Sequence, residues 1–218
     1  MPRPHLSFLL SAFLLLALLL PPFFPTGFFS GESGAASVIR EGDILFHTST
    51  SSQSALIRLL TNSPWTHCGI VLRHKGQLQV LEAVQPVKLT PVAVWTARGA
   101  GGRYALKRLK NADAVLTPAV LGRMRRTGVD MLGRGYDRQF RWSDEKLYCS
   151  ELVWKLYRRA AGITLCRPRH FRDFNLSRPA LAKEALRRYG GNMPPPEEAV
   201  VTPADLFASP LLRTPREE

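Results

Sequence analysis

Two cysteines and one histidine are the residues of this 218-residue chain whose spacing first suggests chemistry. His67 and Cys68 are neighbours in the segment WTHCGIV, and Cys149 lies in the segment YCSELVW. An imidazole that takes the proton of a thiol produces a thiolate, the nucleophile of cysteine hydrolases. The first question is therefore which of the two cysteines His67 serves.

Strand geometry separates His67 from its neighbour. The segment HCGIVLR, residues 67–73, has the alternation that predicts a β-strand. Successive side chains of a strand point to opposite faces, so His67 and Cys68 face away from each other. A small thiol among apolar strand residues most simply fills space in a core. We therefore predict that Cys68 is a core residue and not the partner of His67.

The next segment supplies a carboxylate. A second alternating run, LQVLEAV, follows HKGQ, so Lys75 and Gly76 are expected to form a two-residue hairpin turn. That register places Gly69 opposite Glu82, with Glu82 one diagonal step from His67 on the same face. The alternative is that Glu82 is a solvent-facing residue at a strand end, and a turn longer by one residue would reverse the faces.

Cys149 lies near the start of the segment SDEKLYCSELVWKLYRRAAG, whose apolar spacing predicts a helix that ends at Gly162. The partial positive charge of a helix N-terminus lowers the pKa of a thiol, more so beside an imidazolium. The same pattern also permits a buried core cysteine on the face of Val153 and Leu156. The pattern alone leaves both interpretations of Cys149 open.

The remaining thiol and imidazoles show no disulfide or metal pattern. Three cysteines leave at least one unpaired, no CxxC occurs, and Cys166 is expected to be an ordinary loop or core thiol. Neither HxH nor HExxH occurs among the histidines His47, His67, His74 and His170. We therefore expect no metal site and no cofactor.

The surrounding segments predict an α+β fold. Strands are expected at EGDILFH and at RYALKRL, the latter after a glycine-rich loop at 99–102, and helices at SALIRLL, at 115–132 and at RPALAKEALRRYGG. The proline-broken tail MPPPEEAVVTPADLFASP is expected to lie across the domain surface. Strands grouped in the first half and helices in the second argue against alternating β-α-β units.

The N-terminal residues predict export. Arg3 precedes the almost wholly apolar run LSFLLSAFLLLALLL, as in a secretory signal, and residues 6–24 approach the roughly 20 residues that span a bilayer. We expect residues 1–36 to be a signal peptide or a membrane anchor and residues 37–218 to be a single domain. The expected location is extracytoplasmic, in the periplasm or at the cell surface.

The net charge of +13 favours anionic partners such as lipid head groups, acidic wall polymers or nucleic acid. Arginines cluster at 123–126, 158–159 and 187–188, but no zinc-finger spacing, ribonucleoprotein strand or glycine-rich phosphate loop accompanies them. We therefore expect a basic face beside a membrane surface and do not expect nucleic-acid binding.

Four motifs in a fixed order resemble a known family. GDILFH, THCGIVL and QVLEAV resemble the strand series of NlpC-type cell-wall peptidases, and YCSELVWKLYRRAAGI resembles their nucleophile helix. In the ordinary family that helix comes first, whereas here it comes last, as in the circularly permuted papain-like group. Over residues 41–212 the chain most resembles the YiiX/YebB-like branch of that group, and EAVQPVKLTP and TPADLFASP agree with it.

The resemblance implies a circularly permuted papain-like fold, with a small antiparallel sheet packed against helices and the nucleophile helix C-terminal to the strands. It implies Cys149 as nucleophile, His67 as base and Glu82 as the residue that orients His67, where ordinary NlpC-type enzymes more often have a histidine. The backbone N–H of Cys149 is a natural oxyanion donor, and Tyr148 and Gln53 are candidates for the second.

The implied activity is hydrolysis of amide bonds through an acyl-enzyme, with cell-wall peptides as a candidate substrate. Permuted relatives that resemble lecithin–retinol acyltransferase use the same constellation, so a lipid acyl hydrolase or acyltransferase is the second hypothesis. A non-catalytic binding domain is the third, and the intact set of Cys149, His67 and Glu82 argues against it.

Overall fold

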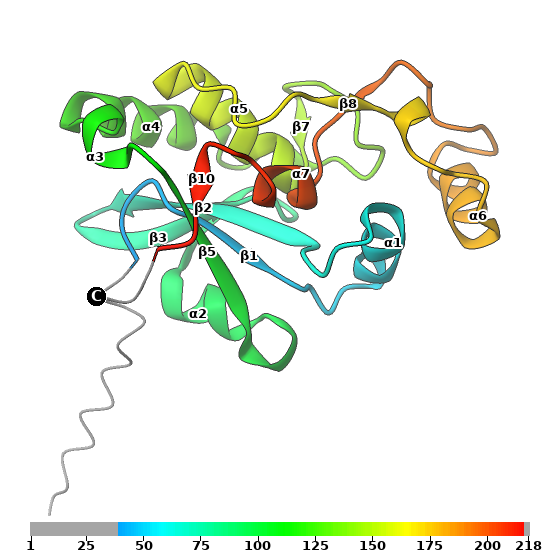
Figure 1. The fold of residues 1–218 in the computed structure, drawn as a ribbon, viewed down its shortest axis with the longest axis horizontal. Helices are drawn as coiled ribbons and strands as arrows, with labels where there is room; N and C mark the ends of the chain where they lie inside the picture. Colours follow the sequence, from blue (N-terminus) through cyan, green and yellow to red (C-terminus); the bar gives the residue numbers. More distant parts are fainter. Residues whose placement is uncertain (1–38, 216–218) are drawn as a thin grey trace, which may run out of the picture. The chain divides into compact units, whose positions relative to one another are not determined.

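A six-stranded sheet carries two of the three predicted site residues (Figure 1). Its order is β10 (Leu212–Arg213), β5 (Tyr104–Leu109), β1 (Ile44–His47), β2 (His67–His74), β3 (Gln77–Glu82) and β4 (Lys88–Pro91). Neighbouring strands are antiparallel throughout. The computed structural model describes residues 39–215, so the predicted signal peptide or anchor at 1–36 lies outside the described residues.

The β2–β3 hairpin has the predicted register. Lys75 and Gly76 both have positive φ, 47° and 82°, as a two-residue turn requires. The pairing of the two strands places Gly69 opposite Glu82. A Cβ at Gly69 would come within 2.5 Å of a β3 side chain, so the strands could not approach this closely with any larger residue. The prediction that His67 and Glu82 share a face is confirmed.

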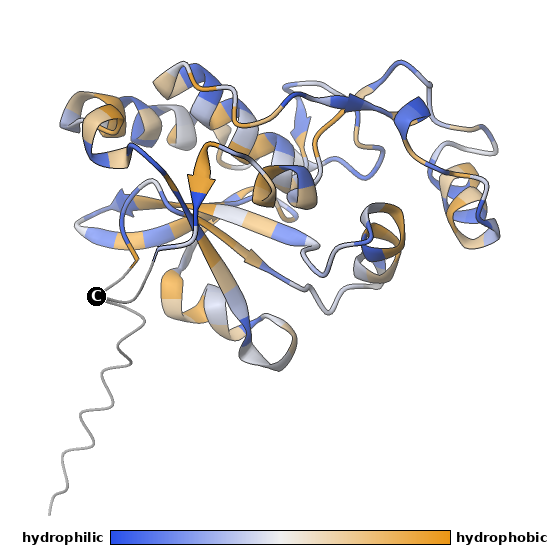
Figure 2. Cartoon of the chain, in the orientation of Figure 1, coloured by the Kyte–Doolittle hydropathy of each residue, from blue (hydrophilic) through white to orange (hydrophobic). Residues whose placement is uncertain are grey.

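Helices cover both faces of this sheet. They are α1 (Ser52–Thr61), α2 (Val92–Ala97), α3 (Ala112–Val115), α4 (Pro118–Met131), α5 (Cys149–Ala161), α6 (Pro179–Arg188) and α7 (Pro203–Phe207). Figure 1 shows α4 and α5 on one side of the sheet and α2 on the other. Much of the length of β1 is hydrophobic, as expected of a strand enclosed between layers (Figure 2).

The alternation of side chains divides the core into two layers. Phe46 and Cys68 are fully buried in the cluster on the α5 side. Leu45 and Val71 are buried in the smaller cluster on the α2 side, where they pack around Trp95. The core position predicted for Cys68 is therefore confirmed.

Helix α5 begins at Cys149 itself. The backbone N–H of Tyr148 donates to Glu151, so the side chain in the first turn caps the helix start. Gly162 ends the helix with a φ of 71°, as predicted. The residues just before Cys149 are not helical, because β7 (Lys146–Leu147) pairs in parallel with β6 (Gly135–Tyr136).

The prediction that the tail only crosses the surface is wrong. The tail forms β9 (Ala199–Val200), which pairs with β8 (Arg169–His170), and then α7 and β10. Leu206 and Leu212 are buried, so the tail closes one edge of the main sheet and supplies part of the core. The segment between the run LQVLEAV and the glycine-rich loop at 99–102, where no element was predicted, also forms β4 and α2.

Within residues 39–215, no helix combines the length and the apolar character needed to cross a bilayer.

Candidate active site

Cys149 and His67 lie on α5 and β2, two elements that pack against each other. Cys149 is the first residue of α5, and His67 is the first residue of β2. Burial lowers the pKa of His67, but hydrogen bonds with Cys149 and Glu82 outweigh it and raise that pKa to about 9. The imidazole is therefore protonated at neutral pH.

The thiol of Cys149 is correspondingly acidic. Its pKa is held well below the ordinary value by a hydrogen bond with the thiol of Cys68 and, against the effect of burial, by the hydrogen bond and charge of His67. The N-terminus of α5 adds a partial positive charge at the same place. These effects favour the thiolate–imidazolium form of the pair over the neutral form.

Cys68 has one contact that strand alternation did not predict. It points away from the face of His67 and into the core, where it belongs to the same buried cluster as Cys149, and its thiol interacts with the thiol of Cys149. Burial and the neighbouring Cys149 raise the pKa of the Cys68 thiol well above its ordinary value. Cys68 thus stays a neutral donor beside the thiolate.

Glu82 lies on the other side of His67. Its Oε2 is 2.8 Å from Nε2 of the imidazole, and its side chain is fully buried. In the neutral ring this contact places the N–H on Nε2, because a carboxylate can only accept a hydrogen bond. Burial alone would raise the pKa of Glu82, but the contact with His67 and its other donors lower it to about 2.

Three further side chains hold the Glu82 carboxylate. Thr90 Oγ1 donates to Oε1 at 2.6 Å, Trp95 Nε1 donates to Oε2 at 3.0 Å, and Arg98 Nη2 reaches both oxygens at 2.6 and 2.7 Å. Trp95 also stacks on the imidazole of His67, with ring centroids 6.0 Å apart. The donors fix both the charge and the position of Glu82.

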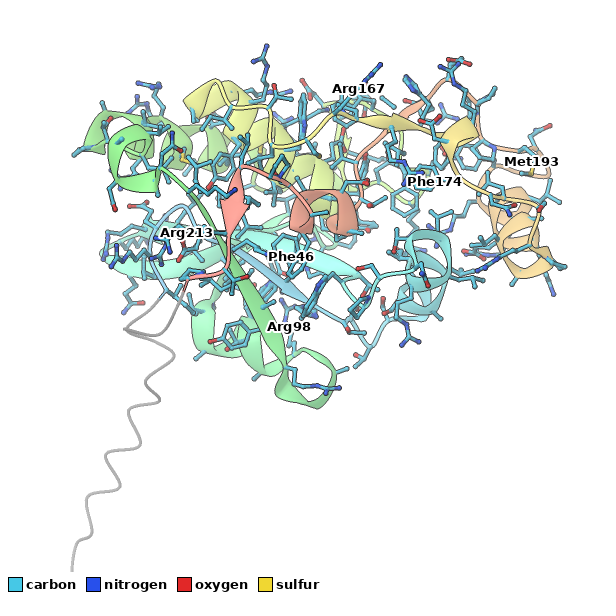
Figure 3. The ribbon with its side chains drawn as sticks, viewed as in Figure 1. Phe46, Arg98, Arg167, Phe174, Met193 and Arg213 are labelled. Atoms are coloured by element: carbon cyan, nitrogen blue, oxygen red, sulfur yellow. The ribbon has the colours of Figure 1, made fainter. Side chains whose placement is uncertain are left out.

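These donors come from β4, α2 and the residue that ends α2, in a stretch for which the sequence predicted no element. Arg98 caps the end of α2, and Figure 3 labels it on the side of the sheet that α2 covers. The three-residue spacing of Trp95 and Arg98 places both on one side of a helical turn. That spacing is the signal in the sequence that could have identified them.

A second histidine lies beside the first. His47 pairs across the sheet with His67, their ring centroids are 5.1 Å apart, and the ring of His47 packs edge-on against Trp95 at 4.4 Å. Burial and the charge of His67 lower the pKa of His47 to about 4, so this imidazole is neutral. Antiparallel pairing of the segments 44–47 and 67–70 would have predicted this contact.

The site opens into a cavity of about 730 Å³ lined by His47, His67, Gln53, Arg98 and Tyr136, among others. Tyr136 also lines a smaller apolar pocket that includes Cys149. Burial raises the pKa of its phenol well above the ordinary value, and the negative charge of Cys149 raises it further. The phenol of Tyr136 therefore stays neutral beside Cys149. No sequence pattern singled out Tyr136.

The two candidates for the second oxyanion donor differ in access. Tyr148 is buried, and its hydroxyl oxygen accepts a hydrogen bond from the backbone N–H of Val201. It lines the small pocket that includes Cys149, but the contact with Val201 already engages its hydroxyl. Gln53 lines the cavity and remains a candidate beside Tyr136.

Comparison with known proteins gives concordant matches. The sequence model of the family described as "Permuted papain-like amidase enzyme, YaeF/YiiX, C92 family" matches residues 38–214. The uncharacterized protein YiiX of Escherichia coli K12 is 39% identical over 177 residues, which cover 81% of this chain and 86% of that protein. The predicted resemblance to the YiiX-like permuted papain-like group is confirmed.

A solved structure of YiiX from Escherichia coli O157:H7 superposes with a TM-score of 0.76 at 38% identity, covering 82% of this chain and 97% of that one. The predicted permuted papain-like α+β fold is confirmed. The description of that structure calls YiiX a metalloprotein. Among residues 39–215 of the present chain, no group of three or more His, Cys, Asp or Glu side chains is arranged to hold a metal ion.

Proposed function

The chain belongs to the family of permuted papain-like amidases, and from this premise we propose that it is a cysteine hydrolase that cleaves amide bonds through Cys149, His67 and Glu82. One observation carries the proposal: the His67 imidazole interacts with the thiol of Cys149 and, through Nε2, lies 2.8 Å from the carboxylate of Glu82. This series is the arrangement that produces a thiolate and holds its base in one orientation.

The first half of the reaction forms an acyl-enzyme. The thiolate of Cys149 attacks the carbonyl carbon of the amide, and the carbonyl oxygen becomes an oxyanion. The backbone N–H of Cys149 at the start of α5 is one donor to this oxyanion, and we assign the hydroxyl of Tyr136 as the second because Tyr136 lines the same small pocket as Cys149. The imidazolium of His67 then protonates the leaving amine as the C–N bond breaks.

The second half releases the acyl group. His67, now neutral, takes a proton from water, and the resulting hydroxide attacks the thioester. The C–S bond breaks, the thiolate of Cys149 is restored, and the imidazolium forms again. Glu82 stabilises the imidazolium in both stages, and its own donors Thr90, Trp95 and Arg98 keep it ionised.

We propose wall peptides as the substrate class and an extracytoplasmic location, secreted or anchored through residues 1–36. The apolar N-terminal run and the net charge of +13 support a protein that works beside an anionic wall or membrane. Cell fractionation of the full chain tests the location. Recovery only with cytoplasmic markers would contradict it.

A second candidate is hydrolysis or transfer of lipid acyl groups. It is favoured by the apolar pocket beside Cys149, which is lined by side chains that include Ile57, Leu60, Phe140 and Phe171. The pocket has a volume of about 40 Å³, so it offers an apolar contact for the first carbons of an acyl group next to Cys149 and not space for a whole chain.

Product analysis separates the two candidates. The full-length protein is incubated with peptidoglycan fragments and, in parallel, with phospholipid vesicles, with Cys149→Ser as the control for each. Release of free amine from the fragments, absent in the control, supports the amidase. Release of fatty acid instead supports the lipid hydrolase, and no Cys149-dependent product from either would overturn both.

A further inference from the structure

The charged side chains that line the large cavity beside His67 are positive. Arg98 and Arg138 line it, and no Asp or Glu is among the residues that do. Glu82 lies beneath the cavity and is fully buried, with its charge held by the donors described above. The surface that a substrate meets is therefore positive and polar.

Arg98 is oriented in advance. It binds Glu82 through Nη2 alone, so within the described residues Nε and Nη1 have no protein partner, and the side chain is 38% exposed. A guanidinium held at one corner loses little conformational entropy when its free edge binds a ligand. Arg138 is exposed at the cavity and, among residues 39–215, its side chain makes no ion pair.

His47 adds an independent observation. It lines the same cavity, is 3% exposed, and has no hydrogen-bond partner on either ring nitrogen within the described residues. An unsatisfied buried donor costs about 1–3 kcal/mol, so a neutral imidazole is rarely left this way without a ligand to complete it. Its N–H is an unpaired donor at the wall of the cavity that the two arginines also line.

We propose that His47, Arg98 and Arg138 form a subsite for an anionic oxygen group of the substrate, a carboxylate or a phosphate, next to the bond that is cleaved. The inference rests on the proposed function. It narrows the substrates to amides that carry a negatively charged group on the side of the cleaved bond that lies toward His67. Guanidinium groups bind both kinds of anion through paired N–H donors.

A pair of alkylating reagents tests the subsite without a known substrate. Iodoacetate and iodoacetamide are nearly isosteric, and each transfers its carbon to the Cys149 thiolate as iodide leaves. The ratio of the two rates, measured by mass spectrometry at Cys149, reports the recognition of the carboxylate. Because the imidazolium of His67 also attracts iodoacetate, the decisive quantity is the change in this ratio between variants.

Arg138→Gln is expected to lower the iodoacetate/iodoacetamide ratio by about 3- to 10-fold, the range for loss of one partly screened charge. Arg138→Lys should restore most of the ratio. Arg126→Gln, which removes the same charge from an exposed position on α4, should leave it unchanged. His47→Phe, which keeps a ring against Trp95, should lower the ratio as well.

Competition identifies the anion. Succinate and glycerol 3-phosphate are added separately, and the one that slows iodoacetate labelling at the lower concentration names the group the subsite prefers. Protection by neither would overturn the proposal. Fast labelling of Cys149 by both reagents, with the same ratio in Arg138→Gln as in the native protein, overturns the subsite alone. Failure of both reagents to label Cys149 ahead of Cys166 overturns the proposed function with it.

Discussion

The imidazole Nε2 of His67 lies 2.8 Å from the Oε2 of Glu82, across a β-hairpin in which Gly69 leaves the space between them. The carboxylate is fully buried and keeps a pKa of about 2 because its donors outweigh its burial. A buried, ionised carboxylate at this distance stabilises the charged imidazole more strongly than a solvated one would.

Glu82→Gln is therefore expected to preserve the fold and to lower kcat by roughly 10- to 10³-fold. The amide still accepts hydrogen bonds but carries no charge to stabilise the imidazolium. A cysteine enzyme should lose less than the roughly 10⁴-fold drop of the serine-triad template, because a thiol ionises more readily. Circular dichroism checks the fold, and full activity in Glu82→Gln would leave Glu82 without a role in orienting His67.

The pH profile of kcat/KM should follow the thiolate–imidazolium pair. The pKa of His67 is raised to about 9, so its charge is present below that value and is lost as the pH rises through 9, which gives the alkaline limb. The acid limb comes from protonation of Cys149, whose pKa is lowered. In Glu82→Gln the alkaline limb should move to lower pH, because a nearby anion is removed. An alkaline limb that stays in place would contradict this assignment.

The sequence predicts those parts of the site that depend on contacts between residues close together in the chain. The hairpin is local, so the turn at Lys75 and Gly76 determines the register and places Glu82 beside His67. The start of α5 is also local, because Glu151 caps it. By contrast, Arg98 depends on how β4 and α2 return to the sheet, and no pattern in the β2–β3 hairpin encodes that path.

The tail shows the same limit. Prolines and short apolar pairs indicate loop, and the propensity of a two-residue strand such as β10 is too weak to predict. Leu212 is buried only because β5 offers a free edge on which the tail can pair. Tertiary contact, and not local preference, gives this segment its structure.

Cys68 should tune the nucleophile without being one. Cys68→Ala removes the donor to Cys149, so the acid limb of kcat/KM should move to higher pH, while Cys68→Ser keeps a donor and should move it less. Cys166→Ser changes a half-buried thiol outside the cavity and should leave the profile unchanged. If the pH profiles of kcat/KM are the same for Cys68→Ala and the native protein, Cys68 does not contribute to the low pKa of Cys149.

Asp43 should matter for stability and not for chemistry. Its carboxylate accepts hydrogen bonds from Nε and Nη2 of Arg108, each at 2.7 Å, and both side chains are buried. Asp43→Asn should lower the free energy of unfolding by about 3–5 kcal/mol, because it removes the charge that a buried guanidinium binds. Asp113→Asn is the matched control: its side chain is 92% exposed, and a change within about 0.5 kcal/mol is expected in urea unfolding.

The most direct test of the central claim is site-resolved alkylation of the native protein by iodoacetamide at pH 6, where an ordinary thiol is less than about 1% ionised. Cys149 should be modified first, ahead of Cys68 and Cys166, and His67→Ala should slow its modification by at least about tenfold, because the imidazolium that stabilises the thiolate is gone. Modification of Cys68 or Cys166 first, or an unchanged Cys149 rate in His67→Ala, would contradict the assignment of Cys149 and His67 as the reactive pair.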